Sequence, residues 1–366
     1  MMVKKKTLVA AAVILSSIYL TGCGLLVSNE KKENIDPPQK VTYLKEDGSL
    51  KELQHQSAQD MKKEDVMMTD LYLIDKNGYV VSQTLPLPKT QSIAKEALEY
   101  LVDDGPVSNM LPNGFRAVLP AGTEVRSVQI KDGKAIADFS PEFKEYKAED
   151  EKKILQAITW TLTQFDAVKK VELRVDGQPL KEMPVDGTAI DPNGLSRNIG
   201  INWDVENVVD ITNTRPITVY YLAQDGENYY YVPVTKRVSN NNKDNVTAVV
   251  NELIKGPSRS SELVSEFMPD VKLISAPVVK DGKVTLNFNK SILGSFEEKM
   301  ISKNTLNPLV LSLTEQKGIK SVTVEVDGKT NLVDDKGKPI SETVSRPEHV
   351  NSVSKMFVGE ILRIPR

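Results

Sequence analysis

The sequence predicts an α+β fold built from two tandem, similar domains, and three observations support this prediction. The phrase KDGKAIADF at 131–139 returns as KDGKVTLNF at 280–288, which is 149 residues later. Other segments recur in the same order, and their offsets differ by only a few residues. Within each copy, runs of strand-like and helix-like periodicity alternate. A copy of roughly 135 residues is a domain and not a solenoid repeat.

The chain divides into five predicted parts. A lipoprotein signal peptide is expected at 1–22, followed by a flexible polar stalk at 23–66. The two copies cover 68–204 and 215–352, and a C-terminal tail covers 353–366. This agrees with the total of 366 residues, which has room for about two domains of ordinary size.

Each copy begins with a hairpin and a helix. In the first copy, 71–74 and 79–81 are rich in β-forming residues and flank DKNG, whose Asn-Gly pair is a hairpin signal. The segment QSIAKEALEYLVDDGP then predicts a helix that ends at Gly105-Pro106. The second copy shows the same apolar spacing before Gly256-Pro257.

The second half of each copy adds two strands, a helix and a last strand. EVRSVQI and KAIADF alternate around Asp132-Gly133, a pair that favours a tight turn because glycine accepts a positive φ. EDEKKILQAITWTLTQF predicts an amphipathic helix, and VELRVDG predicts a strand. In the second copy, the helix contains Pro308, which is tolerated in a first turn, so we expect this helix to begin near Asn307.

The order β-β-α-β-β-α-β favours a particular packing. Hairpins require antiparallel pairing, and a helix with one apolar face covers one side of a sheet. We therefore expect each copy to be a mostly antiparallel sheet with two helices packed on one face.

Composition excludes several classes of function. The formal net charge is −3 and the pI is about 5.7, whereas nucleic-acid binding requires a dense cationic face. With two histidines and one cysteine, the chain can form neither a zinc site of clustered His and Cys nor an intrachain disulfide. We expect no cofactor, no metal site and no nucleic-acid partner.

The N-terminus resembles a bacterial lipoprotein signal. Three lysines precede an apolar run at 8–20, which is too short to span a bilayer comfortably but suits a signal-peptide core. The run ends in Leu20, Thr21, Gly22 and Cys23, a pattern similar to the lipobox, in which the cysteine receives diacylglycerol and becomes the first residue. We expect acylation, including palmitate, at Cys23 and anchoring at the extracytoplasmic face of the cell membrane. The alternative is an uncleaved anchor or secretory signal with an incidental cysteine.

No set of residues stands out as catalytic. The sequence has no glycine-rich phosphate loop, His-Glu-x-x-His pair or Gly-x-Ser-x-Gly elbow. Asp103 and Asp104 precede Gly-Pro, where a solvated helix end is expected rather than an acid–base couple. Asp138 of the first copy is replaced by Asn287 in the second, so the copies share no catalytic carboxylate at this position.

Two groups of residues are candidates for contacts. Tyr229, Tyr230 and Tyr231 could form a stacking face for a sugar or for a partner's peptide. The alternative is a strand whose tyrosines alternate between core and surface. Arg197 and Arg346 recur as Ser-Arg in both copies, and a structural salt bridge is expected there, with recognition of an acidic group as the alternative.

Several long segments resemble one protein family. The lipobox, the IDPP of the stalk, LYLIDKNGYVVSQTLPLPK, LPNGFRAVLPAGT and ITWTLTQF are similar to the GerMN-domain lipoproteins of Bacillus sporulation and germination. The resemblance covers nearly the whole chain beyond residue 66, and the first copy carries most of it. The second copy departs more, with its tyrosine-rich strand and the segment SNNNKDN at 239–245.

The resemblance implies a non-enzymatic lipoprotein of a Gram-positive bacterium that is required for sporulation and germination. It would act in the intermembrane space as an assembly or scaffold factor for the channel-like envelope complex between mother cell and forespore. Envelope proteins of that complex and the membrane would be its partners, and the repeated domains would allow self-association. The alternative is a peptidoglycan-binding or cell-wall remodelling factor that uses the tyrosines. A hydrolase with an acid pair assembled across the two domains is a weaker third hypothesis.

Overall fold

The computed structural model describes residues 66–206, 212–226, 228–241, 244–295, 297 and 299–351. The predicted signal peptide with its Leu20–Cys23 motif, nearly all of the stalk and the predicted tail lie outside the described residues. All described residues belong to one compact unit of the chain.

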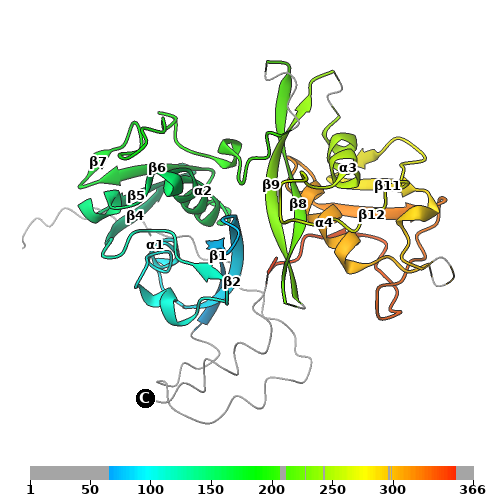
Figure 1. Ribbon diagram of the computed structural model, residues 1–366, viewed down its shortest axis with the longest axis horizontal. Helices are drawn as coiled ribbons and strands as arrows, with labels where there is room; N and C mark the ends of the chain where they lie inside the picture. Colours follow the sequence, from blue (N-terminus) through cyan, green and yellow to red (C-terminus); the bar gives the residue numbers. More distant parts are fainter. Residues whose placement is uncertain are drawn as a thin grey trace, which may run out of the picture. The chain divides into compact units, whose positions relative to one another are not determined.

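The first copy, coloured blue to green in Figure 1, has the predicted order of elements. Its strands and α-helices are β1 (Val66–Asp75), β2 (Val80–Pro88), α1 (Ile93–Glu99), β3 (Phe115–Arg116), β4 (Val125–Lys131), β5 (Lys134–Phe139), α2 (Glu151–Leu162), β6 (Lys170–Val175) and β7 (Gln178–Pro179). The two-residue strands β3 and β7 are additions to the prediction. Short 3₁₀ helices lie at Pro106–Asn109, Pro141–Lys144, Ala148–Asp150 and Arg197–Ile199.

The second copy repeats this order. Its elements are β8 (Thr214–Asp225), β9 (Asn228–Ser239), α3 (Asn245–Lys255), β10 (Val278–Lys280), β11 (Lys283–Phe288), α4 (Lys303–Thr314), β12 (Ser321–Val326) and β13 (Val344–Ser345), with a 3₁₀ helix at Lys290–Ile292. The α+β class and the tandem of two similar domains are thereby confirmed.

The expectation of a single sheet in each copy needs correction. The first copy has one sheet of order β2-β1-β3 and another of order β4-β5-β6-β7, and the second has β8-β9 and β10-β11-β12-β13. Pairing is antiparallel except between β5 and β6 and between β11 and β12. Each parallel pair is connected through a helix, because parallel strands require a crossover.

The expectation that both helices cover one face of one sheet also needs correction. The helix α2 packs against both β1 and β6, and α4 packs against both β8 and β12. Their side chains occupy the strand edges: the Tyr72 N–H donates to Thr161 Oγ1 at 3.1 Å, and the Tyr220 N–H donates to Ser312 Oγ at 2.8 Å. At these points a hydroxyl of the helix, and not a neighbouring strand, accepts from the N–H of the hairpin strand.

The helix α4 begins at Lys303, earlier than the predicted start near Asn307. Ser302 caps it by accepting a hydrogen bond from the Asn304 N–H at 3.1 Å. Pro308 therefore lies inside the helix, where it lacks the N–H that would bond to the Asn304 carbonyl. The cap and the burial of the helix outweigh this loss.

The two KDGK phrases form hairpin turns, as predicted. They join β4 to β5 and β10 to β11. Asp132 and Asp281 have φ values of 50° and 51°, and the glycines that follow have φ values of 78° and 79°. Two successive positive φ values are typical of the type I′ turn, which matches the twist of a hairpin.

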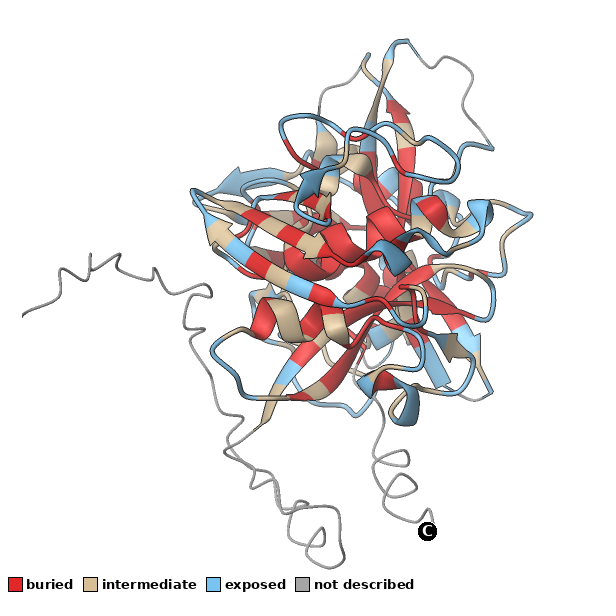
Figure 2. Cartoon of the chain, turned by 90° about the vertical axis from the view of Figure 1, so that its left-hand side faces the viewer, coloured by how far each residue is buried: buried red, intermediate tan, exposed pale blue. Residues whose placement is uncertain are grey.

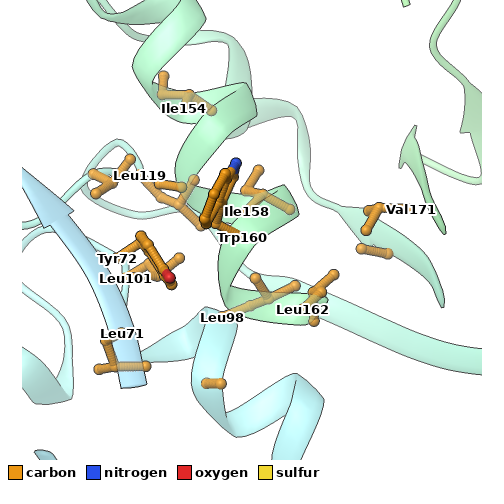
Figure 3. Close-up of a cluster of buried hydrophobic side chains, with 14 of the residues drawn as sticks. Leu71, Tyr72, Leu98, Leu101, Leu119, Ile154, Ile158, Trp160, Leu162 and Val171 are labelled. Carbon is orange, nitrogen blue, oxygen red and sulfur yellow. The ribbon is translucent and has the colours of Figure 1, made fainter. Parts of the chain in front are cut away.

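Each copy has its own hydrophobic core. Figure 2 faces the first copy and shows buried residues along its central strands and helices. In the close-up of Figure 3, the rings of Tyr72 and Trp160 lie among leucines and isoleucines, with their centroids 5.6 Å apart. Val81 of β2 belongs to the core of the second copy, so the two copies are joined by apolar packing as well as by the chain.

Candidate functional site

The two copies meet where β2 faces β9. We call this contact the seam and define it by the facing edges of β2 and β9 together with residues 196–204 and 345–351, which end the two copies. Polar side chains, rather than direct pairing of the strands, connect the two edges.

Asn202 connects the strands from the first copy. Its Oδ1 accepts a hydrogen bond from the Val80 N–H at 2.8 Å, and its Nδ2 donates to the Val80 carbonyl and to the Pro233 carbonyl, each at 2.8 Å. Val80 lies on β2 and Pro233 lies on β9, so one side chain holds both copies. Asn202 has a φ of 47°, a conformation that asparagine adopts more readily than most residues.

Asn351 makes the matching set of bonds from the second copy. Its Oδ1 accepts from the Tyr231 N–H at 2.8 Å, and its Nδ2 donates to the Tyr231 carbonyl at 2.9 Å and to the Ser82 carbonyl at 2.8 Å. Tyr231 lies on β9 and Ser82 on β2. Asn351 is only 6% exposed, so these bonds are shielded from water.

The seam has approximate two-fold symmetry. Val80 and Tyr231 are 151 residues apart in the sequence, and so are Ser82 and Pro233. Each asparagine therefore binds the N–H and carbonyl of one residue in its own copy, and the carbonyl two positions further along in the other copy. A surface that contacts its own equivalent in this way is called isologous.

A charged cluster lies beside the seam. Arg197 Nη1 donates to Glu315 across the copies at 2.7 Å, and Arg346 Nη2 lies 3.3 Å from the same carboxylate. The Glu315 side chain is 10% exposed. The Arg197 guanidinium also lies 4.4 Å from the centroid of the Trp160 ring, and that of Arg346 lies 5.2 Å from that of Tyr220. The expected salt bridges of the two arginines are confirmed, and they share one carboxylate.

The charges in this cluster differ between the copies. Burial acts to raise the pKa of Glu315, but Arg197 and Arg346 outweigh it and hold that pKa below its usual value. In the first copy the matching position is Gln164, which binds the Asp70 backbone: its Oε1 accepts from the N–H at 3.1 Å and its Nε2 donates to the carbonyl at 2.7 Å. The seam thus pairs two guanidinium groups with one carboxylate.

The three candidate contact tyrosines have different surroundings. Tyr229 is 45% exposed. The Tyr230 hydroxyl donates to Asp75 Oδ2 at 2.8 Å, across the two copies. The Tyr231 hydroxyl accepts from Asn307 Nδ2 at 2.8 Å. The exposed fraction of the side chain therefore differs between neighbouring tyrosines. The hydroxyls of Tyr230 and Tyr231 are bonded within the chain, and Tyr229 is the most exposed of the three.

The position held by Asp138 in the first copy and by Asn287 in the second has a structural role in both. Asp138 Oδ1 accepts from the Gly177 N–H at 2.9 Å, and Asn287 Oδ1 accepts from the Gly328 N–H at 3.0 Å. The turn requires only a side-chain oxygen that accepts from the glycine N–H, and both a carboxylate and an amide supply one. Within the described ranges, no three His, Cys, Asp or Glu side chains lie close enough together to hold a metal ion.

The sequence profile of the family called Germane, described as "Sporulation and spore germination", matches residues 70–181 and 218–332. The chain belongs to the Germane family. The spore germination protein GerM of Bacillus subtilis (strain 168) is 54% identical over 366 residues, which is 97% of this chain and 100% of that protein. The solved structure of the tandem GerMN domains of the sporulation protein GerM from Bacillus subtilis is 60% identical, covers 78% of this chain and 99% of that chain, and has a TM-score of 0.74. The predicted family is confirmed.

The second Germane copy exposes apolar side chains where the first copy has a better protected apolar residue or an exposed polar one, Gln129. Ile274 is 51% exposed, whereas Val125, 149 residues earlier, is 4% exposed. Val278 and Val279 on β10 are 61% and 54% exposed. We call Ile274, Val278 and Val279 the apolar edge, because β10 is an edge strand of its sheet and Ile274 precedes it, donating its N–H to the Asn287 carbonyl of β11 at 2.8 Å.

Pro277 accounts for the apolar edge. It stands 149 residues after Val128, which is 2% exposed in the first Germane copy. Proline has no N–H for the ladder and shortens a strand, so β10 spans Val278–Lys280, whereas β4 spans Val125–Lys131. In the first copy, α1 packs on β4.

Asn202, Asn351 and Glu315 are contact residues that the motifs and repeats of the sequence do not predict. The asparagines carried a usable signal, since they end the segments LSRNIGIN and VSRPEHVN at the same offset of 149. Glu315 carried none, because the first Germane copy has Gln164 at that place.

The membrane anchor of this Germane protein stays a prediction. Leu20, Thr21, Gly22 and Cys23 lie outside the described residues. Among the residues that the structure does describe, no helix is both long and apolar enough to cross a bilayer.

Proposed function

We propose that this chain acts in sporulation and spore germination as a lipid-anchored, non-enzymatic scaffold. Lipid on Cys23 would hold the two Germane copies at the extracytoplasmic face of the membrane, in the space between mother cell and forespore. There they would contribute a binding surface to an envelope complex. The name of the Bacillus subtilis relative, spore germination protein GerM, supports the process in which we place the chain.

The apolar edge is the observation that carries this proposal. Large exposed apolar side chains grouped on an edge strand are typical of protein–protein contacts. In the first copy, α1 packs on the corresponding strand, and the position of Val278 holds the polar residue Gln129, so the exposed apolar side chains are particular to the second copy.

The use of the recurring polar residues supports a binding role over a catalytic one. Asp138 and Asn287 each complete a turn, and Arg197 and Arg346 both bind Glu315. These positions hold the domains in shape and in register. They do not converge on a place where a substrate would react.

Site-specific crosslinking in sporulating cells tests the scaffold role. A photoreactive amino acid at Val278 should form an adduct with an envelope protein. Gln129 is the matched control, because it is exposed and occupies the same position in the first copy, 149 residues earlier. Equal adducts from both positions, or none from Val278, would reject the proposal.

The anchor is tested separately. Replacing the cysteine, as in Cys23→Ser, should move the protein from the membrane fraction to the soluble fraction and abolish labelling with a palmitate analogue. A variant that stays in the membrane fraction would show that the N-terminal segment is an uncleaved anchor.

Tyr229 favours peptidoglycan binding as a second candidate function, because its exposed ring could stack on a sugar. Tyr229→Ala should then abolish pelleting with purified peptidoglycan, while Tyr231→Phe should not, since the Tyr231 hydroxyl only accepts from Asn307. If the unaltered protein does not pellet, this second function is rejected.

A further inference from the structure

Three lysines lie beside the apolar edge of the second copy. Lys280 stands two positions after Val278 on β10, so the two side chains point to the same face of the strand. Lys283 begins β11 and pairs with Lys280 across the turn. The Lys320 N–H donates to the Gly282 carbonyl at 2.7 Å, which holds Lys320 next to that turn. We call Lys280, Lys283 and Lys320 the lysine corner, and all three are exposed.

The fold does not balance the charge of the lysine corner. The ion pairs that the structure describes for the second copy use other side chains. Asp281 lies within the turn, but one carboxylate does not balance three ammonium groups. Lys280 and Lys283 face each other directly, and like charges in that arrangement destabilise a sheet. The corner therefore carries an excess of positive charge that folding does not require.

The first copy has the same three lysines in a different setting. Lys131, Lys134 and Lys169 precede those of the corner by 149, 149 and 151 residues. Lys134 forms an ion pair with Glu172 at 3.3 Å, whereas the second copy has Thr323 at the position of Glu172. The first copy also has no equally exposed apolar residue at the positions of the apolar edge. Among the described residues, the combination of unbalanced lysines with exposed apolar side chains is therefore particular to the second copy.

The backbone of β10 is open to a further strand. β10 is an edge strand, and a two-residue turn joins it to β11. In such a hairpin the residues that flank the turn, Lys280 and Lys283, form a hydrogen-bonded pair, and bonded and non-bonded pairs alternate from there. The next pair, Val279 and Val284, is therefore non-bonded. The N–H and carbonyl of Val279 point away from β11, where an extended segment of another protein can bond to them.

Protection of the edge against aggregation does not account for the lysine corner. A lysine on an edge strand discourages pairing with other chains. Only Lys280 lies on the edge strand, since Lys283 lies on the inner strand β11 and Lys320 precedes β12. The exposed side chains of Val278 and Val279 act in the opposite direction, because they favour contact with a partner.

We propose that β10 binds an extended segment of an envelope protein as an added strand, and that this segment carries acidic side chains next to apolar ones. The apolar side chains of the partner cover the apolar edge, and its carboxylates pair with the lysine corner. The inference rests on the scaffold role proposed above and adds the chemistry of the partner to it.

A protein strand fits these observations better than an anionic bilayer does. A bilayer supplies negative charge, but it has no backbone groups in register with the N–H and carbonyl of Val279. A rim of one charge sign beside an apolar centre is typical of a protein interface, and it selects a partner of opposite charge.

Charge reversal tests the acidic partner. The full chain carries the photoreactive amino acid at Val278, as in the crosslinking experiment above, together with Lys280→Glu and Lys320→Glu. In sporulating cells the yield of the adduct should fall about tenfold or more, because like charges then meet at the contact. Lys131→Glu with Lys169→Glu is the matched control, since it makes the same two changes in the first copy and should leave the yield unchanged.

Both sets of changes preserve the hairpins, because each places a glutamate opposite a lysine, Lys283 or Lys134. Equal yields from the two sets would overturn the acidic partner and leave the scaffold role standing. No adduct from Val278 with the lysines unaltered would reject the scaffold role and this inference with it.

Val279→Pro tests the added strand. It removes the N–H that points away from β11 without removing a bond to β11, and an edge strand accepts proline in that setting. The adduct yield at Val278 should fall about tenfold, while thermal unfolding of the purified protein stays unchanged. Val279→Thr is the control, because it keeps the N–H and a β-branched side chain and should retain the adduct. Equal yields from these two variants would overturn strand addition.

Vesicles test the bilayer directly. The full chain carrying Cys23→Ser is mixed with vesicles of phosphatidylcholine and phosphatidylglycerol in equal parts, and separately with vesicles of phosphatidylcholine alone. We expect the same pelleting with and without Lys280→Glu and Lys320→Glu. Pelleting that needs phosphatidylglycerol and is lost in this variant would overturn the protein partner, because the lysine corner would then bind lipid.

Discussion

The Glu151 carboxylate accepts a hydrogen bond from the Tyr146 hydroxyl at 2.9 Å and at the same time holds the loop that follows β7. Its two oxygens accept from the N–H groups of Val185, Asp186 and Thr188 at 3.1, 2.7 and 2.9 Å. Glu151 is 0% exposed, so this first residue of α2 fixes a distant loop through a buried charge.

The stability of the first copy should therefore fall in acid. Burial acts to raise the pKa of Glu151, but the N–H and hydroxyl donors outweigh it and lower that pKa from 4.5 to about 2. The folded state holds the charged form, so the stabilisation is complete above pH 4.5 and is lost as the pH falls toward 2. Urea unfolding between neutral pH and pH about 3 should show this loss.

Glu151→Gln should lower the free energy of unfolding by about 2 kcal/mol at neutral pH and flatten the acid dependence. Glu149→Gln, two residues earlier and exposed, is the control and should change neither quantity. An unchanged acid dependence in Glu151→Gln would show that another group titrates.

Exchange of Asp138 and Asn287 should have almost no effect. Asp138→Asn and Asn287→Asp both keep the oxygen that accepts from the glycine N–H, so each should change the free energy of unfolding by less than about 0.5 kcal/mol. Asp138→Ala and Asn287→Ala should each cost about 1 kcal/mol, because the N–H loses its partner. Chemical denaturation measures all four; a large loss in Asp138→Asn would show that the charge itself matters.

Gly200→Ala should destabilise the seam. Gly200 has a φ of +74°, and a Cβ there would lie 2.6 Å from the Trp203 ring. Gly187→Ala is the matched control, since Gly187 has a φ of +70° with no atom within 4 Å. The control should lose about 1 kcal/mol from backbone strain alone, and Gly200→Ala about 2 kcal/mol or more. Equal losses in thermal unfolding would mean that Trp203 moves aside freely.

Pro308→Ala should stabilise the second copy by about 1 kcal/mol, because it restores the N–H that can bond to the Asn304 carbonyl. The first copy already has Ala157 at this position, 151 residues earlier. The reverse change, Ala157→Pro, should cost about 3 kcal/mol or more. Chemical denaturation tests both; a loss of stability in Pro308→Ala would show that packing of the ring outweighs the missing bond.

Much of the local structure could be predicted because its cause is local. The alternating runs and the Asp-Gly turns act within a few residues and appear at the expected places. The first helix of the first copy is also present, but it ends at Glu99 and not at the predicted Gly105-Pro106. The start of α4 could not be predicted from the local pattern, because Pro308 is a stronger signal for a helix start than the capping residue Ser302. In the folded chain, burial of the whole helix places its start at Lys303 and keeps Pro308 inside it. The sequence also did not predict that Thr161 and Ser312 accept hydrogen bonds from strand N–H groups. In the helical pattern, both residues occupy positions that are typical of a solvent-facing polar side.

The sequence by itself determined the duplication, the α+β class, the order of the elements, the family and the absence of a shared carboxylate at Asp138. Only the tertiary structure decided which edges meet and what connects them. Asn202 and Val80 are 122 residues apart, and their bond exists because two surfaces formed by distant segments come within hydrogen-bond distance. The same holds for Arg197 and Glu315, whose pairing crosses the two copies. Contacts of this kind depend on how whole domains fit together, and a periodic pattern along the chain carries no information about that fit.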